Sequence, residues 1–181
     1  VAELPAGSGF WYVHEFDVDE LGLGVERVAD MAVSPDDDSV WVVHGRAQSG
    51  DQPAFSVYDP RADAWDHIDG AAPGGDGSLP PTDQVLAVTF DASGVLWAGS
   101  WSRGVIRYDG DAWESFTDPD GVCGRNVWAI DASGSEVWAA CGEVSGSVGV
   151  GTGAAHWDGS GWETWSMADG LPTDTVLAVA M

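Results

Sequence analysis

The chain has 181 residues, and its apolar share of 44% is large enough to build one sizeable folded domain. Thirty acidic residues stand against six basic ones, all of them arginine, and the formal net charge is −24. This charge argues against general binding to nucleic acids or to anionic membranes, and no apolar run approaches the length of a membrane-spanning segment.

Short apolar runs alternate with clusters of turn-forming residues along the whole chain. The composition includes 25 glycines, nine prolines and 11 tryptophans, whereas lysine, a good helix former, is absent. Runs of strand length separated by Gly, Asp, Ser and Pro are typical of an all-β protein.

The first predicted elements form a unit of four strands, which we name A to D. A strand at about 10–17, FWYVHEFD, precedes it and resembles a D strand. The run VADMAVSPDDDSVWVVHG then predicts a hairpin of strands A and B, and FSVYDP and AWDHID add strands C and D. The first unit therefore spans about 28–69.

The same order of strands recurs twice more. In the second unit, about 85–118, the strands come from VLAVTFDASGVLWAGS, GVIRYDG and AWESFTD. In the third unit, about 127–167, they come from VWAIDASGSEVWAACG, GAAHWDG and GWETWSM. A last run, TVLAVAM at about 175–181, matches an A strand alone.

The spacing of these units predicts a β-propeller. The first valines of the A strands stand at 28, 85, 127 and 176, which are 57, 42 and 49 residues apart. Four-stranded repeats of this length are typical of propeller blades, whose two apolar faces are buried by radial stacking. We expect Trp41, Trp97 and Trp138, which share one position in strand B, to be mostly buried between blades.

Three segments resemble the two-component-regulator propeller repeat: GVLWAGSWSRGVIRYDG, WESFTDPDG and GLPTDTVLAVA. The resemblance covers nearly the whole chain and is looser where the B–C links of the first and third units are longer. It implies a β-propeller that is often extracytoplasmic, periplasmic or secreted, and often a ligand-sensing module. Streptogramin lyase is a distant propeller relative that uses loop histidines with a metal; it implies a metal-assisted lyase or hydrolase as the alternative, although no corresponding histidine pair can be placed here.

The three units do not close a ring, since propellers have about four to eight blades. We therefore expect residues 1–181 to be a single propeller module that either belongs to a longer propeller or is completed by a second copy. Exposed blade edges also favour self-association, which leaves an architectural role in an assembly as a second alternative.

Cofactor motifs are weak in this sequence. No Gly-x-Ser-x-Gly elbow or phosphate-binding loop stands between a strand and a helix. The acidic runs SPDDDS and DPDG lack the downstream bidentate Glu of an EF-hand, and turn geometry alone favours their Asp and Gly residues. We expect no metal and no cofactor, with calcium as the minority alternative.

The two cysteines flank the first hairpin of the third unit. Cys123 precedes strand A and Cys141 ends strand B. Counting outward from a turn near residues 133–134 places Cys123 opposite residue 143 or 144, close to Cys141. A disulfide, which fits an oxidising compartment, and a pair of free thiols are both compatible with this register.

One rim of the predicted propeller gathers positive charge. The D–A and B–C loops lie on the same face of a propeller, and four of the six arginines fall in them. Because a guanidinium group binds carboxylate or phosphate in a bidentate manner, we expect this rim to bind an anionic small molecule or protein partner without catalysis. The alternative is that the arginines pair with nearby carboxylates. The candidate rim residues, including polar and aromatic neighbours, are Arg27, His44, Arg46, Trp101, Arg103, Arg125, Asn126 and Glu143.

Overall fold

The computed structural model describes residues 27–45, 52–70, 77–82, 84–145 and 148–181. In these residues, twelve strands form three antiparallel sheets of four strands, and the strand order within each sheet follows the chain. The predicted all-β class and the four-stranded blades are thereby confirmed. The strand expected at about 10–17 lies outside the described residues.

The twelve strands of the described residues fall into three blades. Blade 1 contains β1 (Asp30–Val33), β2 (Val40–Val43), β3 (Phe55–Asp59) and β4 (Ala64–Ile68). Blade 2 contains β5 (Val85–Phe90), β6 (Leu96–Ser100), β7 (Val105–Tyr108) and β8 (Trp113–Phe116). Blade 3 contains β9 (Asn126–Ser133), β10 (Glu136–Ser145), β11 (Val148–Trp157) and β12 (Trp162–Trp165).

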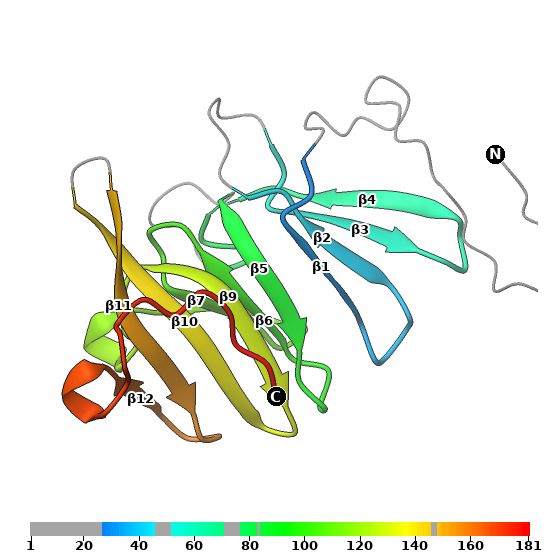
Figure 1. Cartoon of the computed structure of the whole chain (residues 1–181). Coiled ribbons are helices and arrows are strands. Elements are labelled where there is room, and N and C mark those ends of the chain that lie inside the picture. Colours follow the sequence, from blue (N-terminus) through cyan, green and yellow to red (C-terminus); the bar gives the residue numbers. More distant parts are fainter. Residues whose placement is uncertain (1–26, 46–51, 71–76, 83, 146–147) are drawn as a thin grey trace, which may run out of the picture.

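The three sheets lie side by side like a fan, with β1 against β5 and β5 against β9 (Figure 1). One apolar cluster lies between blades 1 and 2 and includes Phe55, Leu96 and Ile106. A second cluster lies between blades 2 and 3 and includes Trp97 and Val137. The facing sides of successive blades thus bury their apolar residues against each other, as radial stacking requires.

The B–C connection of blade 3 is a continuation of the sheet. The glycine-rich stretch after strand B reads in the sequence as a longer link, but β10 and β11 stay paired out to Ser145 and Val148. Each strand is 10 residues long, and Figure 1 shows their hairpin extending beyond the rest of the blade. Beyond Gly142, β10 no longer pairs with β9, so this end of the hairpin is a two-stranded ribbon.

The three equivalent tryptophans are mostly buried, as expected, but to different degrees. Trp97 is 2% exposed and contacts Trp157 and Trp162 of blade 3, at ring-centroid distances of 5.7 and 5.9 Å. Trp41 and Trp138 are only half-buried. Trp138 stacks on His156 of its own blade, because no further sheet of the described residues covers this face.

The strand expected at about 175–181 is not formed. This segment runs beside β9 (Figure 1) and is held there by two side chains rather than by a ladder. Trp128 Nε1 donates to the carbonyl oxygen of Val176 at 2.7 Å, and the amide of Met181 donates to Asp131 Oδ2 at 2.7 Å. A strand needs a partner that shares its backbone hydrogen bonds, and the described residues place none beside this segment.

Helical structure in the described residues is limited to two short 3-10 turns, η1 (Asp118–Asp120) and η2 (Met167–Asp169). Each follows strand D of its blade. Within this part of the chain, no helix has the length and apolar character needed to cross a membrane.

Candidate anion-binding rim

Hydrogen bonds join the region between strands B and C of each blade to the segment that leads toward strand A of the next blade. Gly45, which follows β2, donates its amide to Val85 O at 2.9 Å at the start of β5, and Gly104 donates to Arg125 O at 2.8 Å in the link before β9. In blade 3, Gly153 of β11 donates to Asp174 O at 2.9 Å, in the segment after η2. The two kinds of loop therefore lie on the same face of the molecule, as the sequence analysis expected.

The B–C loop of blade 2 is hydrogen-bonded to the segment before blade 2 and to the start of blade 3. The amide of Trp101 donates to Gln84 O at 2.9 Å, in the link that leads into blade 2. The amide of Ser102 donates to Asn126 Oδ1 at 3.0 Å, at the start of blade 3. Residues 101–104 thus bridge two successive links, which gives this short loop a defined position.

Gly104 allows this arrangement for steric reasons. Its φ angle is +68°, and a Cβ atom at this position would collide with the carbonyl oxygen of Phe116. Ser102 also has a positive φ, of 77°. Sequence reasoning missed both residues, although the Ser-Arg-Gly turn between two strands was a usable signal.

Arg103 and Arg125 stand on adjoining loops, because the bond from Gly104 to Arg125 O brings the two segments together. Arg125 is exposed and Arg103 is half-buried. The amide of Arg103 donates to Ser100 Oγ at 3.1 Å, so its backbone is also fixed.

The guanidinium groups of Arg27, Arg103 and Arg125 form no ion pair with any residue that the structure describes. In contrast, Arg107 in β7 pairs with Asp109 at 3.2 Å and with Glu114 at 3.0 Å. The alternative in which rim arginines are neutralised by nearby carboxylates therefore gains no support from the described part of the chain.

The remaining arginines are placed less closely together. Arg27 lies beside Gly45 of blade 1, and a Cβ atom on that glycine would stand 3.7 Å from Arg27 Nε. Arg46 lies outside the described residues. The structure therefore brings Arg103 and Arg125 together and leaves Arg27 on the rim of another blade.

His44 lies beneath the rim and not on it. Its side chain is buried, with Nδ1 2.8 Å from Arg27 O and Nε2 2.7 Å from Ser56 Oγ. Ser56 Oγ also lies 3.1 Å from His67 Nδ1. Burial lowers the pKa of His44, and the neighbouring His67 lowers this pKa further. His44 therefore differs from a rim residue that faces a ligand: it follows β2 and turns into the blade, where both ring nitrogens have partners.

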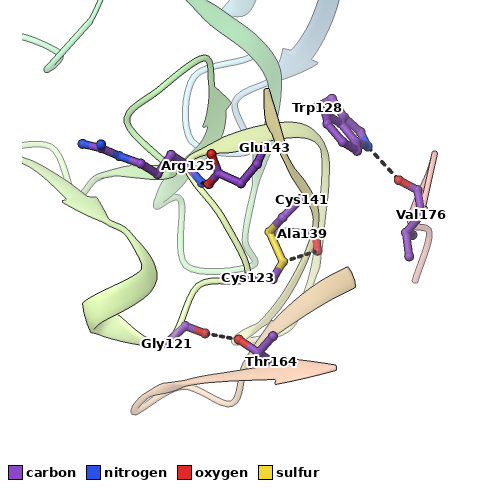
Figure 2. The surroundings of a disulfide bond; sticks show 9 residues. All are labelled: Gly121, Cys123, Arg125, Trp128, Ala139, Cys141, Glu143, Thr164 and Val176. Atoms are coloured by element: carbon purple, nitrogen blue, oxygen red, sulfur yellow. Dashed lines mark hydrogen bonds between the residues drawn. A yellow bond between two sulfur atoms is a disulfide. The ribbon is translucent and has the colours of Figure 1, made fainter. Parts of the chain in front are cut away.

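Asn126 and Glu143 hold the rim loops in place through hydrogen bonds to the loop backbone. Asn126 is buried, and its amide oxygen accepts from Ser102. Glu143 Oε1 accepts from the backbone amide of Arg125 at 2.9 Å. In Figure 2 the Arg125 side chain extends away from Glu143, so the carboxylate fixes the backbone and leaves the guanidinium group directed outward.

A disulfide joins Cys123 to Cys141, with their Cα atoms 5.6 Å apart (Figure 2). Of the two alternatives that the sequence allowed, the structure has the bond. It lies two residues before Arg125 on one segment and two residues before Glu143 on the other. The disulfide and the hydrogen bond from the Arg125 amide to Glu143 together hold the D–A link against β10. The same link is also held to β12, where Thr164 Oγ1 donates to Gly121 O at 2.7 Å.

Metal ligands do not gather in the described residues. No group of three or more His, Cys, Asp or Glu side chains lies close enough there to hold a metal ion. The metal-assisted lyase alternative thus gains no support from this part of the chain.

No family model matches this sequence, and no curated protein matches it. Solved structures do share its fold. The extracellular domain of BT3049 from B. thetaiotaomicron, described as a hybrid two-component system, matches 83% of this chain with a TM-score of 0.64 and 13% identity. The extracellular domain of BT4673 from the same organism matches 76% with a TM-score of 0.51 and 15% identity.

A third neighbour is YCF48 bound to D1 peptide, which matches 80% of this chain with a TM-score of 0.51 and 16% identity. The present chain spans 20%, 16% and 42% of the lengths of these three chains, in the same order. The likeness shows a propeller fold, and the first two neighbours agree with the resemblance to the two-component-regulator propeller repeat.

Proposed function

We propose that this chain is an extracytoplasmic, non-catalytic binding or sensing module, and that the rim around Arg103 and Arg125 binds an anionic group. The observation that carries the proposal is the pair of fixed, adjoining loops whose guanidinium groups have no carboxylate partner in the described residues. In a chain with 30 acidic residues, these two arginines stand on adjoining loops without a carboxylate partner among the described residues.

The overall charge restricts the class of ligand. A net charge of −24 repels polyanions at long range, so the rim suits a compact group such as one carboxylate or one phosphate. Arginine binds such groups through two parallel N–H donors, and its affinity is strengthened where the backbone is already fixed. The ligand is therefore a small molecule, or a protein segment that presents a single anionic group.

Two findings support an extracytoplasmic location. A disulfide persists in oxidising compartments and is rare in the cytosol. Two of the structural neighbours are extracellular domains of signalling systems, which agrees with a sensing role. YCF48, which has the same fold, is bound to a peptide, so a peptide is one ligand class to test.

The test is an amide NMR titration with inorganic phosphate, and with a short neutral peptide that ends in a free carboxylate. We expect shifts at Ser102, Gly104 and Asn126, and no shifts when the same peptide ends in a carboxamide. Replacement Arg103→Ala should weaken binding about tenfold or more, since it removes a charge-assisted contact.

Arg61→Ala is the matched control, because Arg61 lies in the C–D turn at the opposite end of blade 1 and the substitution makes the same change of charge. If Arg103→Ala and Arg61→Ala lowered the affinity for the probe equally, the effect would come from the change in net charge and not from the rim. Absence of rim shifts with both probes would overturn the proposal.

A further inference from the structure

A chain of hydrogen bonds runs through blade 1 beneath the rim, from His67 in β4 to the backbone of Arg27. Ser56 Oγ in β3 lies 3.1 Å from His67 Nδ1 and 2.7 Å from His44 Nε2, and His44 Nδ1 lies 2.8 Å from Arg27 O. His44 and Ser56 are buried, whereas His67 is half-buried. The inner part of this chain is therefore closed to water, so its groups depend on one another for hydrogen bonds.

The chemistry of these groups fixes the direction of each hydrogen bond. A carbonyl oxygen only accepts, so His44 Nδ1 carries a hydrogen and donates it to Arg27 O. In a neutral ring the other nitrogen, His44 Nε2, is then an acceptor, and Ser56 donates its single hydroxyl hydrogen to it. Because Ser56 has no second hydrogen, His67 Nδ1 must donate to Ser56 Oγ. Both histidines are thereby assigned the Nδ1–H form.

This chain can hold one extra proton but not two. A proton on Nε2 of His67 leaves its Nδ1–H in place and changes none of these hydrogen bonds. A proton on Nε2 of His44 makes that nitrogen a donor, so Ser56 must turn its hydroxyl hydrogen toward a neutral His67. If His67 is also charged, both neighbours of Ser56 are donors, and its buried hydroxyl hydrogen has no acceptor among the described residues.

The charges around His44 also oppose a second proton. The guanidinium group of Arg27 lies beside Gly45, the residue after His44, and His67 is a like charge once it is protonated. Burial, the largest influence, lowers the pKa of His44; the hydrogen bond to Arg27 O raises this pKa, and His67 lowers it. In the described part of blade 1, no carboxylate forms an ion pair with His44.

The other ionisable side chains of the strands around His44 are engaged elsewhere. Each of them forms a hydrogen bond with a group outside this chain, and none bonds to the ring of either histidine. These side chains are Asp30 in β1, Tyr58 and Asp59 in β3, and Asp66 in β4.

We infer that His44, Ser56 and His67 form an acid-sensitive latch, which holds the backbone of Arg27 against blade 1 and opens when both histidines become charged. With His67 alone charged, the latch stays closed and His44 stays neutral. With both charged, Ser56 has no acceptor and His44 is a buried cation beside a like charge, so its ring moves out to water. The hydrogen bond to Arg27 O is then lost. Acid thus frees the segment that leads into β1, independently of any ligand at Arg103 and Arg125.

Nitrogen-15 NMR of the histidine rings over a pH series tests the latch in the wild-type chain. Near neutral pH we expect His44 and His67 both in the Nδ1–H form. As the pH falls, His67 should gain a proton while His44 stays neutral. Protonation of His44 should then coincide with loss of hydrogen-exchange protection at the amide of Ala29, which donates to Val43 O. An Nε2–H form of His44 near neutral pH, or two charged rings with Ala29 still protected, would overturn the proposal.

The variant His67→Gln separates the latch from burial alone. The glutamine oxygen can accept from Ser56 while a charged His44 donates to it, so His44 should gain its proton at a higher pH than in the wild type. His156→Gln is the matched control, because His156 is half-buried against Trp138 in blade 3. It should leave the titration of His44 unchanged. Equal titration curves of His44 in the two variants would contradict the latch. Circular dichroism checks folding, and the wild-type titration decides the question if His67→Gln is unfolded.

Discussion

The indole Nε1 of Trp97 donates a hydrogen bond to Asp91 Oδ2 at 3.0 Å, within the buried contact between blades 2 and 3. The other carboxylate oxygen of Asp91 accepts from Ser93 and from the amide of Val95. Burial alone would raise the pKa of Asp91, but these hydrogen bonds outweigh it and lower the pKa. The carboxylate of Asp91 thus accepts hydrogen bonds from the A–B turn and from the indole N–H of Trp97 at the centre of the interface.

Replacing Asp91 by Ala should cost about 2–3 kcal/mol of unfolding free energy, because a buried indole donor and two turn amides lose their acceptor. Asp37→Ala is the matched control in blade 1, where Trp41 Nε1 donates to Ser39 Oγ instead of to the carboxylate. Urea denaturation of both variants measures the difference. Equal losses would show that the Asp91–Trp97 contact adds nothing beyond the turn.

His44 predicts a pH dependence. Its pKa is lowered in the folded state, so the unfolded chain takes up a proton first as the pH falls through about 6.5. The folded state is then disfavoured, and stability declines from pH 7 toward the folded pKa. In His44→Gln this decline should be smaller, as followed by thermal midpoints between pH 7.5 and about 5. Parallel curves for wild type and variant would contradict the assignment to His44.

The disulfide should stabilise the folded chain by about 3 kcal/mol, as expected for a closed loop of this length. Cys123 and Cys141 are 18 residues apart in sequence. Reduction, or a Cys123→Ser/Cys141→Ser double substitution, should lower the denaturation midpoint by the corresponding amount. Alkylation of the unreduced protein should label no thiol, and two labelled thiols would rule out the bond.

Gly104→Ala should destabilise the protein by about 3 kcal/mol, since it combines a positive φ with a collision against the backbone of Phe116. Gly110→Ala is the control, because its φ is also positive, at 98°, while its Cβ would meet nothing within 4 Å. The control should lose about 1 kcal/mol. If chemical denaturation gave equal losses of unfolding free energy for the two variants, the collision with the backbone of Phe116 would not explain the effect of Gly104→Ala.

Trp97→Ala should cost about 3–5 kcal/mol, the usual effect of deleting a buried aromatic side chain. Trp138→Ala should cost clearly less, although the two residues hold the same position in their blades, because Trp138 is half-buried. Urea denaturation of both variants gives the comparison. A larger loss for Trp138→Ala than for Trp97→Ala would contradict the explanation by burial.

The sequence was sufficient for the number of blades and for most strand boundaries, because hydrophobic alternation and turn residues recur in each unit. The sequence was not sufficient to predict the hydrogen-bond partner of an aspartate where one inserted residue shifts its position in the turn. Asp-Ala-Ser-Gly occurs at 91–94 and again at 131–134. In blade 2 the aspartate binds the tryptophan, whereas one extra residue in blade 3 places Asp131 in the strand, paired with Trp138, where it accepts from Met181.

The anion-binding site stays a prediction, and the structure bears only on the arrangement of its loops. The rule that B–C and D–A loops share a face agrees with the hydrogen bond that joins Gly104 to Arg125. The burial of His44 depends on the direction in which the chain leaves β2, which no local pattern shows. The register around Cys141 depends on bulges on both sides of that residue, so the sequence left the disulfide as one of two alternatives.

The position of the disulfide also has a mechanical consequence. The bond encloses the whole turn between β9 and β10 in a covalent loop. Tension applied to the two ends of the chain passes through the bond and bypasses the enclosed residues, even after the blade has lost its hydrogen bonds. The oxidised chain, pulled taut, is therefore shorter than the reduced one by about 60 Å, the extended length of the bypassed segment.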